Sequence, residues 1–459
     1  RILALLLCLC MLVGVLAACS KTDTTTPDAS GETAQSGDAA KTGDTAKTGD
    51  VVTIRMWGGV PAESGPQAAC DAFNEAYKDK GIQVEYERFV NDDTGNVKLE
   101  TNMLGGNEID VYMSYTMAQL SKRAEGNMAL DLTELCERDG FDLTQYLGDL
   151  AKNYYVDGKP FCIPCKLDQY GMVVNKTMFD EAGIEVPTEW TYDEFLDVCA
   201  KLTHGEGTDK VYGVFWNSQQ DMAQYAQFMI QQTLGGDNMY TADGTATNFT
   251  DDVWQKTISL ISTTMNEGYA PTHADSVTEK LSQESMFLGG KAAMTIGPWM
   301  VRNIKDTETY PHDFVTAFAP YPVVSEDQRN YTQGGYGDLL CINPRSEHLD
   351  EAWEFAKWYL TEGGLYLASG GRVPAANTYN ADDVVNAFLS GAENLFDADS
   401  TKAVLITPHD NYAAPSITTK NAELTDIINE ELESIYTGQK TVEEGLESAK
   451  TRGDAALAG

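Results

Sequence analysis

The chain is poor in the residues and motifs that carry most enzyme chemistry and most metal binding. Its 459 residues include only five histidines, which lie singly and form no HExxH pair. The sequence also has no GxSxG nucleophile elbow, P-loop, GxGxxG turn or EF-hand loop. It therefore predicts no metal site, no cofactor and no enzyme activity. A pair of catalytic carboxylates of the glycosidase kind stays open, because Asp and Glu together number 70.

Positive charge is also scarce. The chain has 32 Lys and Arg residues and a formal net charge of -38. A field of that sign repels nucleic acid and anionic lipid headgroups, so neither is an expected partner. It also disfavours a large polyanionic ligand, although one small anion could still meet a local arginine. We interpret the acidity mainly as a property that keeps the surface soluble.

The sequence has a single long apolar run, residues 2–18. This run is too short for a membrane-spanning helix, and it predicts a signal peptide over residues 1–18. It ends in Leu16-Ala17-Ala18-Cys19, which resembles the lipobox of bacterial lipoproteins. The resemblance implies lipidation of Cys19 and a protein anchored on the extracellular face of the cell membrane, since two or more acyl chains anchor stably. The alternative is an ordinary secretory signal with a chance cysteine.

Residues 19–50 contain almost no large apolar side chain and nearly repeat the motif AKTGDT. Such a stretch cannot bury enough surface to offset the entropy of ordering it, so we expect a disordered tether. A flexible chain of this length has a mean end-to-end distance of about 30 Å.

The cysteines beyond the anchor allow disulfides outside the cell, but their positions do not decide between disulfides and buried thiols. They are Cys70, Cys136, Cys162, Cys165, Cys199 and Cys341. Cys162 and Cys165 have CxxC spacing in an expected strand, which would point their sulfurs to opposite faces. This favours a structural role over a zinc or redox site.

From Val51 onward, strand-like and helix-like segments alternate. The expected elements are strands at 51–57, 82–90, 109–114, 159–164 and 171–175, with helices at 65–79, 94–104, 192–202, 351–360 and, broken at Gly438, 421–457. Thr191 and Glu194 form a predicted capping box, and Trp190 can pack on Phe195. Alternation of this kind predicts a parallel sheet with ligands at the carboxyl ends of its strands, where Trp57, Ser114 and Tyr115 lie.

Aromatic residues lie at the ends of several expected elements. They are Trp57, Tyr115, Tyr170, Trp216, Trp299 and Tyr336. Sugars present apolar C–H faces and a rim of hydroxyl groups, so a sugar site needs aromatic surfaces together with carboxylates, amides or arginines. The alternative for each tryptophan is core packing, which we expect for Trp190, Trp254, Trp353 and Trp358.

Several motifs occur in an order that resembles one protein family. They read GKPFCIP at 158–164, GMVVNKTMFDEAGI at 171–184, PTEWTYDEF at 187–195, GKAAMTIGPW at 290–299 and, more weakly, GNEIDV at 106–111, GGYG at 334–337 and TVEE at 441–444. Together they resemble the family 1 extracellular solute-binding proteins, the receptors of ABC sugar importers, over about 51–457. Val174, Ile109 and Gly445 stand where that family usually has Tyr, Pro and Ala.

The resemblance implies an α/β fold, a two-lobe clamp of the type II periplasmic-binding-protein kind with three hinge crossings near 165–170, 290–297 and 343–347. The expected N-terminal lobe comprises 51–166 and 293–344, and the C-terminal lobe comprises 167–292 and 345–459.

It also implies a monomeric receptor that binds a mono- or oligosaccharide between the lobes and delivers it to an ABC permease. The expected contact residues are Trp57, Ser114, Tyr115, Asp168, Tyr170, Trp216, Trp299, Tyr336, Asp338 and Arg372. Arg372 could instead pair with surplus acid. Alternatives are a surface carbohydrate hydrolase, or the same clamp holding a peptide, a polyol or, least expected because few cations are predicted there, a small anion.

Trp299 provides a direct test of this prediction. Replacement by Ala removes the indole surface, so Trp299→Ala is expected to weaken sugar binding while leaving the fold intact. Isothermal titration and circular dichroism measure the two effects. Unchanged affinity in a folded variant would remove Trp299 from the site.

Overall fold

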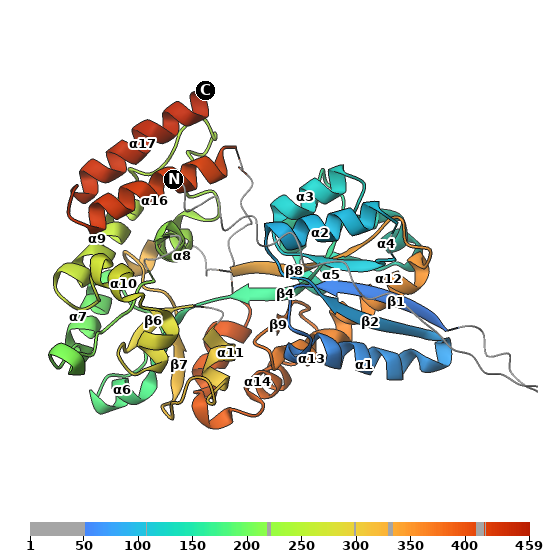
Figure 1. The fold of residues 1–459 in the computed structure, drawn as a ribbon, viewed down its shortest axis with the longest axis horizontal. Coiled ribbons are helices and arrows are strands. Elements are labelled where there is room, and N and C mark those ends of the chain that lie inside the picture. Colours follow the sequence, from blue (N-terminus) through green and yellow to red (C-terminus); the bar gives the residue numbers. More distant parts are fainter. Residues whose placement is uncertain are drawn as a thin grey trace, which may run out of the picture. The chain divides into compact units, whose positions relative to one another are not determined.

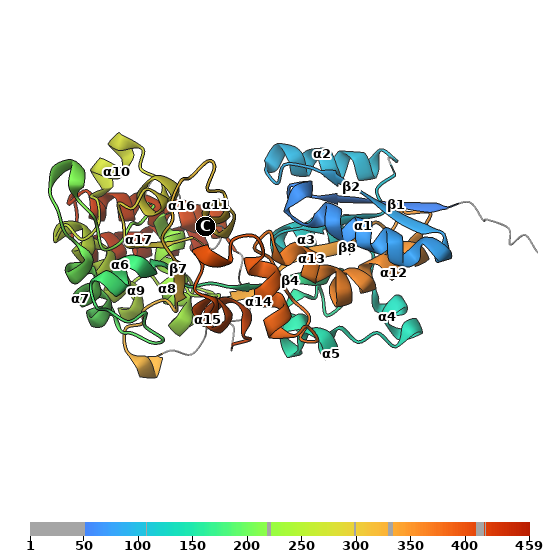
Figure 2. The same cartoon turned by 90° about the horizontal axis from the view of Figure 1, so that it is seen from below.

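The computed structural model describes residues 51–106, 108–217, 222–297, 300–328, 334–409, 417 and 419–459. These residues belong to one unit, Thr48–Gly459. Its strands form two separate sheets with helices packed on both faces (Figures 1 and 2). None of the helices in these ranges is both long and apolar enough to cross a membrane.

The larger sheet has six strands in the order β2-β1-β3-β8-β4-β9. In chain order they are β1 Val52–Gly58, β2 Ile82–Arg88, β3 Val111–Ser114, β4 Ile163–Gln169, β8 Gly334–Ile342 and β9 Val373–Pro374. The first three run parallel, as their alternation with helices predicts. β8 is antiparallel to both β3 and β4, and β9 is antiparallel to β4.

The smaller sheet has three strands in the order β6-β5-β7, both pairs antiparallel. They are β5 Met172–Asn175, β6 Met294–Ile296 and β7 Thr316–Ala319. Adjacent residues of β5 point to opposite faces of the sheet, so Val173 packs in one hydrophobic cluster and Val174 in another. Val174 is fully buried, so it contributes core packing where the family usually has a tyrosine.

The helices divide between the two sheets. One core of the larger sheet includes residues of α1 (Pro66–Tyr77), α12 (Leu349–Trp358) and α13 (Gly364–Ala368), and the other includes α2 (Asp93–Leu104) and α3 (Met117–Glu125). One core of the smaller sheet includes α7 (Tyr192–Leu202), α8 (Met222–Leu234), α9 (Asp252–Asn266), α16 (Asn421–Tyr436) and α17 (Val442–Ala458), and the other includes α11 (Met300–Lys305) and α14 (Ala381–Leu389). The shorter helices are α4 (Thr133–Asp139), α5 (Leu143–Leu147), α6 (Lys176–Glu181), α10 (His273–Glu279) and α15 (Ala398–Thr401).

The structure confirms predictions that depend only on residues close together in the sequence. α7 spans the predicted 192–202, and its capping box is formed in both directions between Thr191 and Glu194. The ring of Trp190 lies 5.2 Å from that of Phe195 in an edge-on contact. Gly438, with φ 73°, lies between α16 and α17 where the predicted helical segment breaks.

The six cysteines of the described part are free thiols. Cys162 packs in a cluster with Cys341, and Cys165 packs in the cluster on the other face of the sheet. The expectation that the CxxC sulfurs point to opposite faces is thus confirmed. Burial raises the pKa of Cys70 to about 12 and that of Cys341 to about 11, as suits inert core thiols.

The strand pairing differs from the expected division into lobes, whose boundaries were set at residues 293 and 345. β6 and β7 add to the smaller sheet, whereas α12 and α13 pack on the larger one. The chain therefore passes back to the larger sheet after β7, not near 290–297, and returns to the smaller one after β9, not near 343–347. Of the three expected crossings, 165–170 coincides with β4 and the turn into β5.

The contact between α16 and α17 provides a pH prediction. Glu431, 3% exposed, accepts hydrogen bonds from Arg452 and Ser448, each at 2.8 Å, and pairs with Lys440. Burial alone would raise the pKa of Glu431, but the hydrogen bonds from Lys440 and Arg452 outweigh it and the pKa is lowered. The carboxylate therefore stabilises the folded state above the pKa of an unfolded glutamate, and this contribution is lost as the pH falls through the folded pKa.

Glu431→Gln is expected to reduce the free energy of unfolding by roughly 1–3 kcal/mol at neutral pH. The difference from the unsubstituted protein should shrink in acid, below about pH 4. Urea unfolding at several pH values measures it. Glu430→Gln is the matched control, because the Glu430 side chain is 63% exposed; an equal effect in both variants would contradict the assignment.

Candidate functional site

The second half of β4 has charged side chains on one face and an apolar and an amide side chain on the other. Alternate residues of a strand point to opposite faces, so Lys166 and Asp168 share one face while Leu167 and Gln169 share the other. The partner strand β8 sets Gly337 opposite Lys166 and Tyr336 opposite Leu167. The residues expected from the sequence divide between these two faces.

The polar face holds a hydrogen-bonded group made of Lys166, Asp168 and Tyr170. The Tyr170 hydroxyl donates to Asp168 Oδ1 at 2.5 Å, and the Lys166 ammonium pairs with the same carboxylate. Lys166 Nζ also donates to the Tyr170 hydroxyl at 3.3 Å. The Lys166 and Asp168 side chains remain 20% and 21% exposed, so both can be reached from solvent.

The Asp168 carboxylate lies directly over the backbone of Gly337. A Cβ atom added at Gly337 would lie 2.4 Å from Asp168 Oδ2, so this close approach requires glycine. The next residue, Asp338, has φ 48°, a left-handed conformation that is unusual for a residue with a side chain. Backbone strain of this kind is often found at functional sites.

Asp338 forms an ion pair with Arg372, whose Nε donates to Asp338 Oδ2 at 2.8 Å. Burial by itself would lower the pKa of Arg372, but the Asp338 carboxylate more than offsets this and the pKa is raised. The guanidinium is therefore a permanent charge. Arg372 thus does pair with acid, one of the two roles expected of it, and its side chain remains 18% exposed.

Tyr115 approaches this ion pair from the carboxyl end of β3. Its hydroxyl accepts a hydrogen bond from the Gly59 backbone N–H at 2.5 Å, just beyond the end of β1. Burial raises the pKa of Tyr115, and the Asp338 charge raises it further. The structure therefore brings Tyr115, Asp338 and Arg372 together from three segments distant in sequence.

A small cavity of about 30 Å³ joins these elements to those of the smaller sheet. Its wall includes Lys166 and Tyr170 from the polar face, Gly371 from the segment before β9 and Val301 from α11. A cavity of this size can hold a water molecule. Lys166, Gly337 and the first turn of α11 were not expected from the sequence, although the spacing of two between Lys166 and Asp168 signals a shared strand face.

Three of the expected residues have the surroundings of core side chains. Trp57 is 7% exposed and packs with Phe89, Leu99 and neighbouring apolar residues. Trp216 is 3% exposed, and its indole N–H donates to Thr264 Oγ1 at 2.9 Å. Ser114 is fully buried and accepts a hydrogen bond from Arg123 at 2.8 Å. The structure therefore offers little surface of these three side chains to a ligand.

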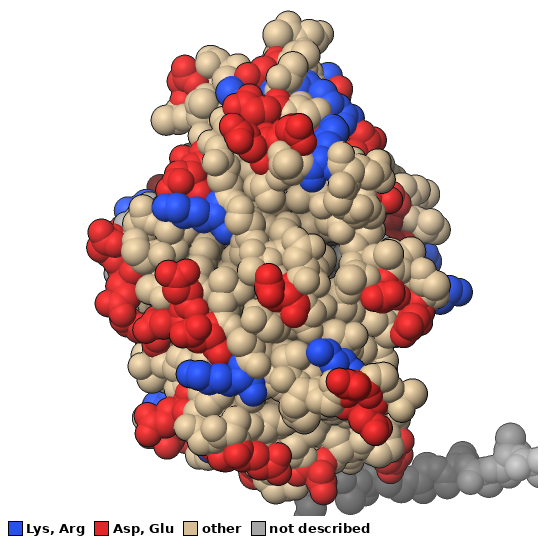
Figure 3. Space-filling model, turned by 90° about the vertical axis from the view of Figure 1, so that its left-hand side faces the viewer, with Lys and Arg blue, Asp and Glu red and all other residues tan. Residues whose placement is uncertain are grey.

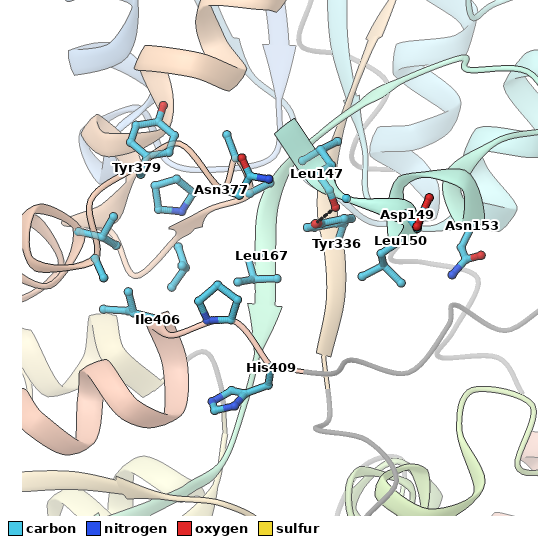
Figure 4. Close-up of a pocket in the computed structure, with 18 residues that line it drawn as sticks. Leu147, Asp149, Leu150, Asn153, Leu167, Tyr336, Asn377, Tyr379, Ile406 and His409 are labelled. Atoms are coloured by element: carbon cyan, nitrogen blue, oxygen red, sulfur yellow. Dashed lines mark hydrogen bonds between the residues drawn. The ribbon is translucent and has the colours of Figure 1, made fainter. Parts of the chain in front are cut away.

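Tyr336 lies on the opposite face of the strands, at a cavity of about 970 Å³ (Figure 4). Its hydroxyl donates to the Leu147 backbone carbonyl at 2.5 Å, and burial raises its pKa to about 12. Leu167, Asn377, Tyr379, Ile406 and His409 also line this cavity. Tyr336 is thus separated by the sheet from Asp168, because the strand register pairs it with Leu167.

Two expected residues lie outside the described part of the chain. They are Trp299 and the proposed lipidation residue Cys19. Within the described ranges, no three His, Cys, Asp or Glu side chains are placed to hold a metal ion.

Comparison with known proteins agrees with this architecture. A multiple sugar-binding protein of Streptococcus mutans is 24% identical over 218 residues, which cover 46% of this chain and 50% of that relative, so the match spans about half the relative's length. Among solved structures, a sugar transporter protein of Rhizobium etli in an open conformation has a TM-score of 0.71 at 20% identity, covering 88% of this chain and 99% of that one. The sugar-binding protein MalE of Xanthomonas citri has a TM-score of 0.67 at 19% identity, covering 89% and 98%.

The fold is therefore the α/β, two-lobe fold of periplasmic-binding-protein type. The sequence over residues 58–365 matches the family described as bacterial extracellular solute-binding protein. With the motif order and the two-sheet architecture in agreement, the chain belongs to the bacterial extracellular solute-binding proteins.

Proposed function

We propose that the protein is an extracellular receptor that binds a mono- or oligosaccharide and delivers it to an ABC-type permease, without breaking a bond of the sugar. The polar face of β4 is the observation that carries this proposal. It presents an acceptor, Asp168, on the strand that leads from the larger sheet to the smaller one, and an aromatic ring, Tyr170, directly after that strand. Carboxylates and aromatic rings are the groups that sugar hydroxyls and C–H faces require.

The names of the relatives support a sugar as the ligand. Those named above are described as sugar-binding or sugar-transport proteins. Gly371, which precedes Arg372 and the larger-sheet strand β9, approaches Val301 of α11, and α11 packs in a core with residues of the smaller sheet. A ligand held by both sets favours the conformation in which they are close, by its difference in affinity for the two states.

The proposed anchor fits delivery to a membrane partner. A lipid at Cys19 and a flexible tether over 19–50 would keep the receptor at high effective concentration near a permease. The acidic surface seen in Figure 3 agrees with a domain that stays off anionic lipid headgroups, since Asp and Glu outnumber Lys and Arg on that face.

A thermal-shift screen tests the class of ligand. The purified protein is heated with neutral mono- and oligosaccharides and, in parallel, with peptides and polyols. A sugar at 100 times its Kd is expected to stabilise the protein by about 2.7 kcal/mol. No shift with any sugar, together with a shift from peptides, would contradict the proposal.

The contact between Asp168 and Gly337 provides a sharper test of the site. Gly337→Ala is expected to displace the Asp168 carboxylate and weaken sugar binding about tenfold, because a hydrogen bond to a charged acceptor is lost. Asp168→Ala should weaken it to a similar extent. In the Asp168→Ala background the added methyl group has room, so Gly337→Ala should then have little further effect.

Isothermal titration of the four proteins closes this double-mutant cycle, with unfolding temperatures as the check on folding. Additive losses from the two substitutions, or full affinity in Asp168→Ala, would remove this carboxylate from the site.

A further inference from the structure

Three arginine residues from three separate elements gather near the first turn of α11. Arg88 ends β2, Arg302 lies on α11 and Arg372 comes just before β9. Figure 1 shows α11 and β9 close to one another below the crossing strand. Such a gathering of positive charge is unexpected in a chain whose formal net charge is -38.

Contacts of the neighbouring residues show where these arginines lie. A Cβ atom added at Gly371 would lie 3.2 Å from Val301 Cβ, so the residue before Arg372 touches the residue before Arg302. Arg88 is paired in register with Gly58, next to the Gly59 N–H that holds the Tyr115 hydroxyl. The charges of Arg372 and Arg88 both lower the pKa of Arg302, so each guanidinium lies near that of Arg302.

The charges of this group do not balance. Asp338 neutralises Arg372 through the 2.8 Å contact. Among the described residues neither Arg88 nor Arg302 has a carboxylate partner, and both side chains are exposed. The Arg302 guanidinium is partly shielded from water, which lowers its pKa, and the charges of Arg372 and Arg88 lower the pKa further. Two unneutralised guanidinium groups held near each other repel, and this repulsion is relieved when an anion binds between them.

We propose that Arg88, Arg302 and Arg372 form a subsite for the anionic group of a carbohydrate ligand, either the carboxylate of a uronic acid or a phosphate or sulfate ester. This inference rests on the proposed sugar-binding function and narrows its ligand class. Arginine is suited to this role because its planar fork donates two parallel hydrogen bonds to such groups. An anion was the ligand class least expected from the sequence, and it now becomes the preferred one. The reason is that the fold brings together arginines that are spread over 285 positions of the chain, from residue 88 to residue 372.

Matched ligand pairs test the subsite. Titration compares glucose with glucuronate, galactose with galacturonate, and glucose with glucose 6-phosphate; the first two pairs probe a carboxylate and the third a phosphate ester. At least one anionic member is expected to bind about tenfold more tightly than its neutral partner, and added salt should reduce that advantage.

Substitutions locate the effect. Arg302→Gln should abolish the preference for the anionic member without lowering the unfolding temperature of the free protein, and Arg88→Gln should reduce the preference independently. Arg302→Lys, which keeps the charge but loses the fork, should retain part of it. Arg345→Gln is the matched control, because Arg345 follows β8 at the opposite end of the sheet and donates to the Asn127 carbonyl; it should change nothing.

The outcomes separate this inference from the function on which it rests. Binding of neutral sugars with no preference for any anionic partner would overturn the subsite and leave the sugar receptor intact. A preference that survives both Arg302→Gln and Arg88→Gln would also overturn it. Failure of every sugar, neutral or anionic, to bind or to shift the unfolding temperature would contradict both proposals.

Discussion

The antiparallel pairing of β4 with β8 is the constraint on which the rest of the site depends. Its register sets Lys166 opposite Gly337 and Leu167 opposite Tyr336. A slip of one residue would exchange the two faces of β4, since side chains alternate along a strand. Asp168 would then point to the 970 Å³ cavity and Leu167 to the polar side. Glycine at 337 protects this arrangement, because any side chain there would occupy the place of the Asp168 carboxylate.

Asp338 shows how strain and charge are combined at the same place. A left-handed backbone at a residue with a side chain costs on the order of 1–3 kcal/mol and persists only where its surroundings hold it. Here the Arg372 guanidinium holds the carboxylate, and the charges of both groups act on the Tyr115 hydroxyl. In so acidic a chain, a buried carboxylate needs a local cation, and the structure provides more cations at this point than one carboxylate requires.

The aromatic residues show where inference from the sequence succeeds and where it stops. An indole at the end of a strand suits a sugar site and a hydrophobic core equally well, because both reward the burial of a flat apolar ring. The structure buries Trp57 and Trp216 in separate cores and leaves Tyr170 beside a reachable carboxylate. The face on which Tyr336 lies depends on pairing with a strand about 170 residues earlier in the chain, which no local pattern reveals.

Most helices and strands, and the family, could be predicted from the sequence. The limits of α7, its capping box, the break at Gly438 and the opposite orientation of Cys162 and Cys165 all follow from interactions between residues a few positions apart. The sheet that β6, β7 and α12 join, the burial of Trp57 and Trp216, and the approach of Arg88 and Arg372 to Arg302 depend on contacts between distant segments. The physical reason is that periodicity and capping are local, whereas burial and charge balance are sums over neighbours that the chain supplies from distant positions.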